Sequence, residues 1–207
     1  NQTLQQTGRG SAALVVSCGR RLVSLTLGVK MSIGNRIDEA IEKLKSGDFE
    51  NALIQISIAI DATATKKFNN EKKVGKRVRN FIMEYQDYLM HFQMDGRVKI
   101  ATAAIYYGDK GSLGDVLYKS IRCALLHNAD ISDQVVFKPG SIMGMEYGKF
   151  IVSEKLLWGL VLILIGQEVN ARQSLKSLHK AYYDNTEISL NDMWGKEEAI
   201  KSLVHYV

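Results

Sequence analysis

The chain has 207 residues, of which 46% are hydrophobic and 24% charged, a balance typical of a globular protein and not of a disordered chain. Its two cysteines, Cys18 and Cys123, exclude a disulfide framework and offer no metal-ligand spacing, which favours a reduced, cytoplasmic setting. The formal net charge is +5, but residues 1–30 hold four basic residues and no acid, so the remaining chain has 23 basic and 22 acidic residues.

Residues 1–30 differ in composition from the rest of the chain. They are rich in Gly, Ser, Thr and Arg, and no helix-period apolar stripe appears before Met31, the first methionine. A mitochondrial targeting segment has a similar composition, whereas the apolar stretch 12–16 is too short for a secretory signal. We interpret residues 1–30 as a disordered or non-native extension and residues 31–207 as the folded domain.

Apolar residues at helical spacing predict three helices in the first half of this domain. The first ends at Gly47, the second spans Phe49–Phe68 with Asp48 as its N-cap, and the third runs from about residue 73 to residue 94. Residues 98–107 fit either a helix or a strand, and we favour a helix. The stripes expected in the core are Ile37, Ala40, Ile41 and Leu44; Leu53, Ile56, Ile60 and Ala64; and Val78, Phe81, Ile82, Tyr85, Leu89 and Phe92.

The second half begins with another predicted helix, because Ser112 and Asp115 have the spacing of a capping box. Two β-prone segments, residues 134–137 and 150–152, then flank a Pro-Gly pair and predict a β-hairpin insertion. Ser153 is expected to cap an apolar helix that ends at Ile165, about half as long as a membrane span. Further helices are expected near residues 168–182 and 190–205, so the predicted fold class is all-α with a hairpin insertion.

A run of basic residues surrounds the start of the third predicted helix, with Glu71 as the one acid among them. This run has two interpretations: an ordinary solvated helix start, or a patch that contacts phosphate groups. Its members are Lys66, Lys67, Lys72, Lys73, Lys76, Arg77 and Arg79.

The segment from Leu117 to Asn128 contains Arg122 and His127, a permanent cation and a side chain that titrates near neutrality. It resembles the signature of the HEPN family, an arginine followed after four to six residues by a histidine. In helix order the resemblance extends over about residues 36–181. It implies a helical bundle that acts as a homodimer and a metal-independent endoribonuclease without a cofactor, in which Arg122 and His127 are catalytic.

Five residues of a regular helix turn by about 500°, which leaves Arg122 and His127 on different faces. They meet only if the helix ends near His127, with Asn128 as a left-handed cap, or if two chains build one site. The structural alternative is that His127 is a C-terminal helix residue stabilised by the helix dipole and that Arg122 pairs with Asp115 or a neighbouring acid. His91, His179 and His205 are expected at the surface or as helix caps.

The resemblance predicts a cytoplasmic RNase that acts in toxin or antiviral defence, with RNA, a second copy and an antitoxin protein as partners and no membrane. The alternative is a HEPN-like module that binds RNA or a nucleotide, or only dimerises, and Cys123 favours it because a thiol is a weak hydrogen-bonding group. Tyr118 has either a packing role or a base-contacting role. The predicted RNA-binding residues are Lys72, Lys73, Lys76, Arg77, Arg79, Tyr118 and Asn128.

Overall fold

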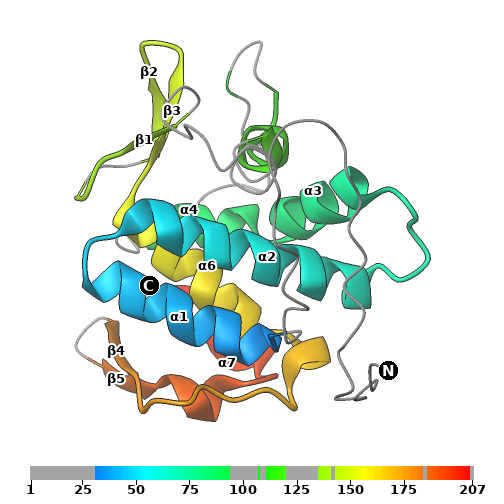
Figure 1. Cartoon of the computed structure of the whole chain (residues 1–207), viewed down its shortest axis with the longest axis vertical. Coiled ribbons are helices and arrows are strands. Elements are labelled where there is room, and N and C mark those ends of the chain that lie inside the picture. The colour runs from blue at the N-terminus through cyan, green and yellow to red at the C-terminus, as the bar shows by residue number, and fades with distance from the viewer. Residues whose placement is uncertain are drawn as a thin grey trace, which may run out of the picture. The chain divides into compact units, whose positions relative to one another are not determined.

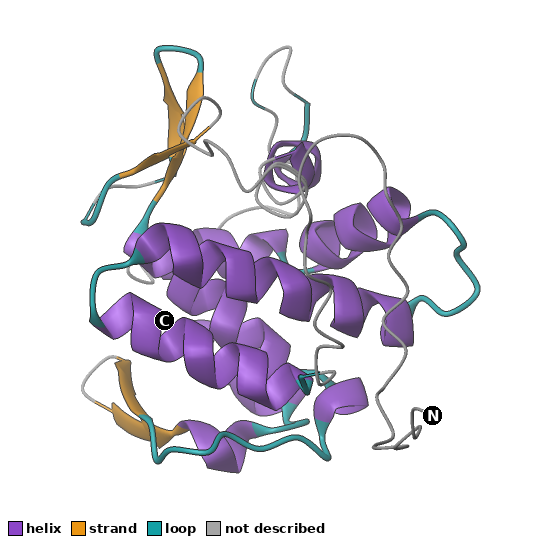
Figure 2. Ribbon diagram, in the orientation of Figure 1, coloured by secondary structure: helices purple, strands orange, loops and turns teal. Residues whose placement is uncertain are grey.

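A computed structural model describes residues 31–93, 107, 111–119, 135–140, 143–183 and 186–205. The chain divides into two units, Asn1–Lys30 and Met31–Val207, and everything below concerns the second unit. Within the described residues the fold is mainly helical with two small sheets (Figures 1 and 2). The all-α prediction is therefore corrected to α+β.

The first two helices match the prediction closely. Helix α1 spans Ile33–Lys45 and α2 spans Phe49–Lys67, and the two lie side by side (Figure 1). Asp48 caps α2 as predicted, with its carboxylate accepting a hydrogen bond from the backbone N–H of Asn51. Gly47 has φ +75°, the left-handed conformation that ends a helix and that glycine adopts without strain. The predicted apolar stripes of both helices are buried.

The third predicted helix is two helices in the structure. Helix α3 spans Val74–Glu84 and α4 spans Gln86–Gln93, with Tyr85 between them. The stripe that we expected in the core is buried along both helices. The predicted buried face is therefore confirmed, but the prediction of one continuous helix is wrong. The break places the Tyr85 hydroxyl within hydrogen-bonding distance of Gln167 and Glu197, which belong to a distant part of the chain.

Helix α6, Glu154–Gly166, lies at the centre of the helical core. Ser153 caps it as predicted, through a 3.1 Å hydrogen bond from the N–H of Leu156. From Leu156 onward the helix is apolar on every side, so it must be surrounded by other elements. It contacts α1, α2, α4 and the last helix, α7, which spans Glu197–His205.

The predicted hairpin insertion is a three-stranded sheet with a different pairing. Strands β1 (Val135–Phe137) and β3 (Lys149–Val152), which contain the two β-prone segments, pair in parallel. The hairpin lies between β2 (Gly144–Glu146) and β3, and Tyr147 and Gly148 form its turn with φ of 47° and 78°. Two successive positive φ values suit a two-residue hairpin turn. The chain also reverses across Pro139-Gly140, but no hairpin forms there, because β3 lies between β1 and β2 in the sheet.

The helix expected near residues 168–182 is not formed. A short 3-10 helix, Glu168–Asn170, is followed by an extended segment and by strand β4, Lys180–Tyr183, which pairs with β5, Thr186–Ser189. Alternation explains the strand: Ala181 and Ile188 are partly or fully buried, while Lys180 and Tyr182 face outward. The helix expected at 190–205 is a 3-10 helix, Leu190–Met193, followed by α7.

Candidate nucleic-acid interface

The basic run begins before α3 and continues along this helix. Its members differ in whether their charged groups already have partners within the protein. Lys76 pairs with the Glu71 carboxylate at 2.8 Å, and Arg77 donates to the Glu71 backbone carbonyl at 2.7 Å. Lys72 and Lys73 are exposed, and neither ammonium group has a hydrogen bond or ion pair with any described residue. These two lysines are therefore the members of the run that can contact a phosphate without breaking a hydrogen bond or an ion pair to a described residue.

Arg79 has a different environment, because it meets the helix that contains Tyr118. The centre of its guanidinium lies 5.0 Å from the centre of the Tyr118 ring. The same guanidinium is 3.7 Å from the Asp115 carboxylate. The structure thus brings together two predicted RNA-binding residues that are 39 positions apart in the sequence.

Two glycines allow α3 to approach the helical residues 113–119 closely. A Cβ added to Gly75 would lie 2.6 Å from the Tyr118 ring and hydroxyl, and one added to Gly114 would lie 3.1 Å from the Arg79 carbonyl. The helical residues 113–119 follow the predicted capping box. The Ser112 N–H donates to the Asp115 carboxylate and the Asp115 N–H donates to the Ser112 hydroxyl, each at 3.2 Å. Local capping and close packing together place Tyr118 against α3.

Asp115 is held as a carboxylate at this junction. Hydrogen bonds from Ser112 lower its pKa below the ordinary value, and the positive charges of Arg79 and Lys119 act in the same direction. Because Asp115 neutralises part of the charge on Arg79, the guanidinium is a weaker phosphate ligand than the ammonium groups of Lys72 and Lys73. The Arg79 side chain is 41% exposed, so part of the planar group stays available for stacking.

The predicted catalytic pair, Arg122 and His127, lies outside the described residues, as do Cys123 and Asn128. The structure therefore neither brings the pair together nor separates it. In the sequence Arg122 follows Tyr118 by four residues. Asp115, the partner for Arg122 in the structural alternative, has Ser112 and Arg79 as partners within the described part of the chain.

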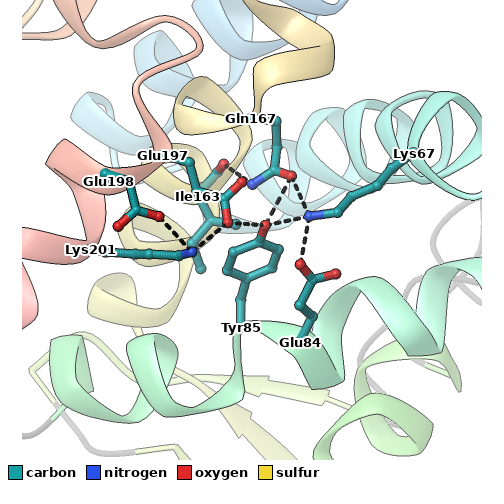
Figure 3. A network of polar contacts seen from close by, with 8 residues as sticks. All are labelled: Lys67, Glu84, Tyr85, Ile163, Gln167, Glu197, Glu198 and Lys201. Carbon is teal, nitrogen blue, oxygen red and sulfur yellow. Dashed lines mark hydrogen bonds and ion pairs between the residues drawn. The ribbon is translucent and has the colours of Figure 1, made fainter.

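A second polar cluster joins α2, α3, α6 and α7 around Tyr85 (Figure 3). The Lys67 ammonium donates to Glu84 at 2.7 Å, to the Tyr85 hydroxyl at 2.5 Å and to the Gln167 side-chain oxygen at 3.1 Å. Since an ammonium has three hydrogens, Lys67 has none left for a ligand. This member of the basic run is structural.

The Tyr85 hydroxyl lies at the centre of this cluster. It is 2.9 Å from a Glu197 carboxylate oxygen and 3.0 Å from Gln167, and its single hydrogen is best placed toward the charged acceptor. Burial raises the pKa of Tyr85 far above its ordinary value, and the neighbouring Glu84 and Glu197 add to the effect. Tyr85 therefore stays neutral, which suits a role in joining helices and not in proton transfer.

A buried histidine that we expected at the surface forms a third cluster. His179 is only 3% exposed; its Nε2 lies 3.0 Å from Asp38 and its Nδ1 lies 2.8 Å from the Lys45 ammonium. An ammonium can only donate, so Nδ1 accepts and Nε2 carries the hydrogen that it donates to Asp38. The cluster fastens the segment before β4 to α1, and Asp38 also accepts from the backbone N–H of Ser177.

The sequence carried no clear signal for this histidine. Leu178, the apolar neighbour that hydropathy would place inward, is 89% exposed, so residue type gave no indication that His179 is the buried one. His91 is likewise buried, at 6% exposure, and not at the surface. The side chain of His205 lies outside the described part.

Neither a membrane span nor a metal site is found among the described residues. None of the described helices has both the length and the hydropathy needed to cross a membrane. Among the same residues, no three His, Cys, Asp or Glu side chains gather as metal ligands.

These features define a mainly helical α+β domain with a basic, tyrosine-bearing surface formed by α3 and the neighbouring helix. The model of the Rv1289 family matches residues 32–206, and the chain belongs to that family. Searches among curated proteins and among solved structures gave no match.

Proposed function

We propose that this protein is a metal-independent endoribonuclease of the HEPN type that acts as a homodimer. The observation that carries the proposal is the contact of Arg79, from the basic run, with Tyr118, four residues ahead of Arg122 in the sequence. An RNA strand bound along α3 would thus reach a residue next to the Arg122–His127 motif. A role in toxin or antiviral defence, with an antitoxin partner, follows from the HEPN resemblance alone.

The proposed reaction uses the ribose 2′-hydroxyl as the nucleophile. One His127 imidazole removes the 2′-hydroxyl proton, the oxygen attacks the adjacent phosphorus, and the bond to the 5′-oxygen of the next nucleotide breaks. A protonated His127, from the second chain, gives its proton to that leaving oxygen. Arg122 stabilises the additional negative charge on the phosphorane-like transition state. The products are a 2′,3′-cyclic phosphate and a 5′-hydroxyl.

A purified protein incubated with RNA in EDTA tests this proposal. We expect cleavage that EDTA does not inhibit, a bell-shaped pH profile centred near neutrality, and no cleavage where the 2′-hydroxyl is replaced by hydrogen. His127→Ala should lower the rate by about 100-fold or more, equivalent to about 2.7 kcal/mol of barrier. Leu178→Ala, at a described position that is 89% exposed, is the control and should cut at the wild-type rate.

The arginine is tested in the same assay. Arg122→Ala should lower the rate as far as His127→Ala does, and Arg122→Lys should recover only part of it, because an ammonium lacks the planar fork of a guanidinium. Arg172→Ala, at an exposed position, is the control. If no RNA is cut, or if cleavage continues unchanged without His127, the catalytic proposal fails.

The second candidate is a HEPN-like module that binds RNA without cutting it. Cys123 favours this candidate, because a thiol next to Arg122 is a poor hydrogen-bonding partner for RNA. The Arg79–Tyr118 contact serves binding equally well in both cases. Salt-dependent RNA binding without cleavage would support the module, and the absence of both would leave a dimerisation domain.

A further inference from the structure

We infer that Arg79 and Tyr118 form a stacking platform for one unpaired base, so that the nucleic acid bound at α3 is single-stranded. This inference rests on the proposed function, because it names the kind of RNA that the same surface binds. The observation behind it is that the guanidinium carbon of Arg79, a member of the basic run, lies over the Tyr118 ring, 5.0 Å from its centre.

The first step of the argument is that Arg79 is held in place. Its side chain is 41% exposed, yet it contacts the Tyr118 ring on one side and the Asp115 carboxylate 3.7 Å away. Asp115 is in turn fixed by Ser112, whose hydroxyl donates to it at 2.8 Å. A side chain positioned before binding loses less conformational entropy when a ligand covers it.

The second step concerns which part of Arg79 is available. Its charge is shared with Asp115, while the ammonium groups of Lys72 and Lys73 have no hydrogen bond or ion pair among the described residues. A phosphate is therefore expected at the two lysines. A base, which is planar and uncharged, is expected on the exposed face of the guanidinium, where arginine planes commonly stack on unpaired bases.

The third step excludes a duplex as the preferred ligand. The bases of an RNA duplex are stacked on one another, and the deep, narrow major groove hides their faces from side chains. A platform that binds the face of a base therefore selects loops, bulges or ends. Lys72 and Lys73 alone, by contrast, would bind the backbone of either form.

The Gly75–Tyr118 contact offers an internal probe of the platform. A methyl group at position 75 would lie 2.6 Å from the ring, so Gly75→Ala must displace the end of the Tyr118 side chain. Gly75 is the second residue of α3 and has no positive φ, so its backbone suits alanine, which also has a better helix propensity than glycine. Gly75→Ala should therefore keep the fold and disturb the platform.

The experiment measures binding of three fluorescent RNAs to the full chain carrying His127→Ala, so that no RNA is consumed. The probes are a single strand of about 12 nucleotides, the same strand with abasic sites at its central positions, and its duplex. The abasic strand keeps every phosphate, so the difference in Kd between the first two probes reports base stacking. We expect the intact strand to bind about tenfold more tightly than the abasic strand.

Arg79→Lys should abolish this preference while keeping the salt dependence, since the charge remains and the plane is lost. Tyr118→Ala and Gly75→Ala should reduce it, with circular dichroism as the check on folding. Lys72→Ala is the matched control: it should weaken both strands equally and lower the salt slope by about 0.7.

The outcomes separate this inference from the proposed function. If the protein binds RNA but does not distinguish the intact strand from the abasic strand or from the duplex, the platform is wrong even if His127 cuts RNA. If the preference is present and is lost in Arg79→Lys, the platform holds even if no RNA is cut. If no probe binds, both the platform and the RNA-binding part of the proposed function fail.

Discussion

His179 shows how one buried side chain can fasten two parts of a chain. Its ring lies between a carboxylate of α1 and an ammonium of the same helix, and both ring nitrogens have partners. Glu42 is a further acid 3.6 Å from Nε2. A side chain in this position contributes through hydrogen bonds to charged groups, which are stronger than those between neutral groups.

Replacing His179 with alanine should destabilise the protein strongly. The change leaves the Asp38 carboxylate without its imidazole partner, and we expect the free energy of unfolding to fall by about 2 kcal/mol or more. Urea denaturation measures this. Lys180→Ala is the control, because Lys180 is an exposed neighbour that pairs with Glu187 and should change stability by less than about 0.5 kcal/mol. Equal losses in the two variants would contradict the structural role of His179.

The sequence alone was informative about residues whose environment is local. Asp48 and Ser153 were identified as caps because a cap is satisfied by an N–H three residues later. The Arg79–Tyr118 contact is of another kind, since nothing within a few positions of either residue indicates it. His179 was misjudged for the same reason, because its partners lie more than 130 positions earlier.

At the scale of elements, the polar cluster around Tyr85 joins helices that are distant in sequence. Burial opposes ionisation of Glu197, but hydrogen bonds from Lys201 and Tyr85, together with the charge of Lys67, hold its pKa below the ordinary value of 4.5. A carboxyl whose pKa is lower in the folded state stabilises that state above its unfolded pKa. This stabilisation is lost as the pH falls through the folded value.

Glu197→Gln should therefore flatten the acid side of the stability curve. The variant should lose about 1 kcal/mol at neutral pH, and its free energy of unfolding should fall less steeply than that of the wild type as the pH drops through 4.5 and below. Glu198→Gln is a matched control, because the Glu198 side chain is 86% exposed. Denaturant titrations across this pH range make the comparison, and parallel curves for wild type and Glu197→Gln would contradict it.

Helices were easier to predict than their connections and the strands. Apolar periodicity identified α1, α2 and the stripe of α3 and α4, because a helix buries residues that are close in sequence. The break at Tyr85 depends on Gln167 and Glu197, which periodicity cannot detect. The parallel pairing of β1 with β3 was not predicted, because the residues of β1 do not indicate which other strand it pairs with or in which register.

At the scale of the whole molecule, the division at Lys30 and Met31 makes a simple prediction. Removing residues 1–30 should leave the melting temperature within about 5 °C of the full chain, because that segment has no apolar helical stripe to bury. Differential scanning calorimetry of the two proteins measures the difference. A larger fall would show that the segment contributes to the folded core.

The central position of α6 also has a consequence for the unfolded chain. From Leu156 to Gln167 there is no charged residue, and in the folded state nearly all of these side chains are buried. Once unfolded, this run has the composition of an aggregation-prone segment, with charges only at its two ends: Glu154 and Lys155 before it and Glu168 after it. Heating should therefore be followed by irreversible association, so that the apparent melting temperature rises with scan rate and falls with protein concentration. The operational stability of this protein is then set by how slowly α6 is exposed.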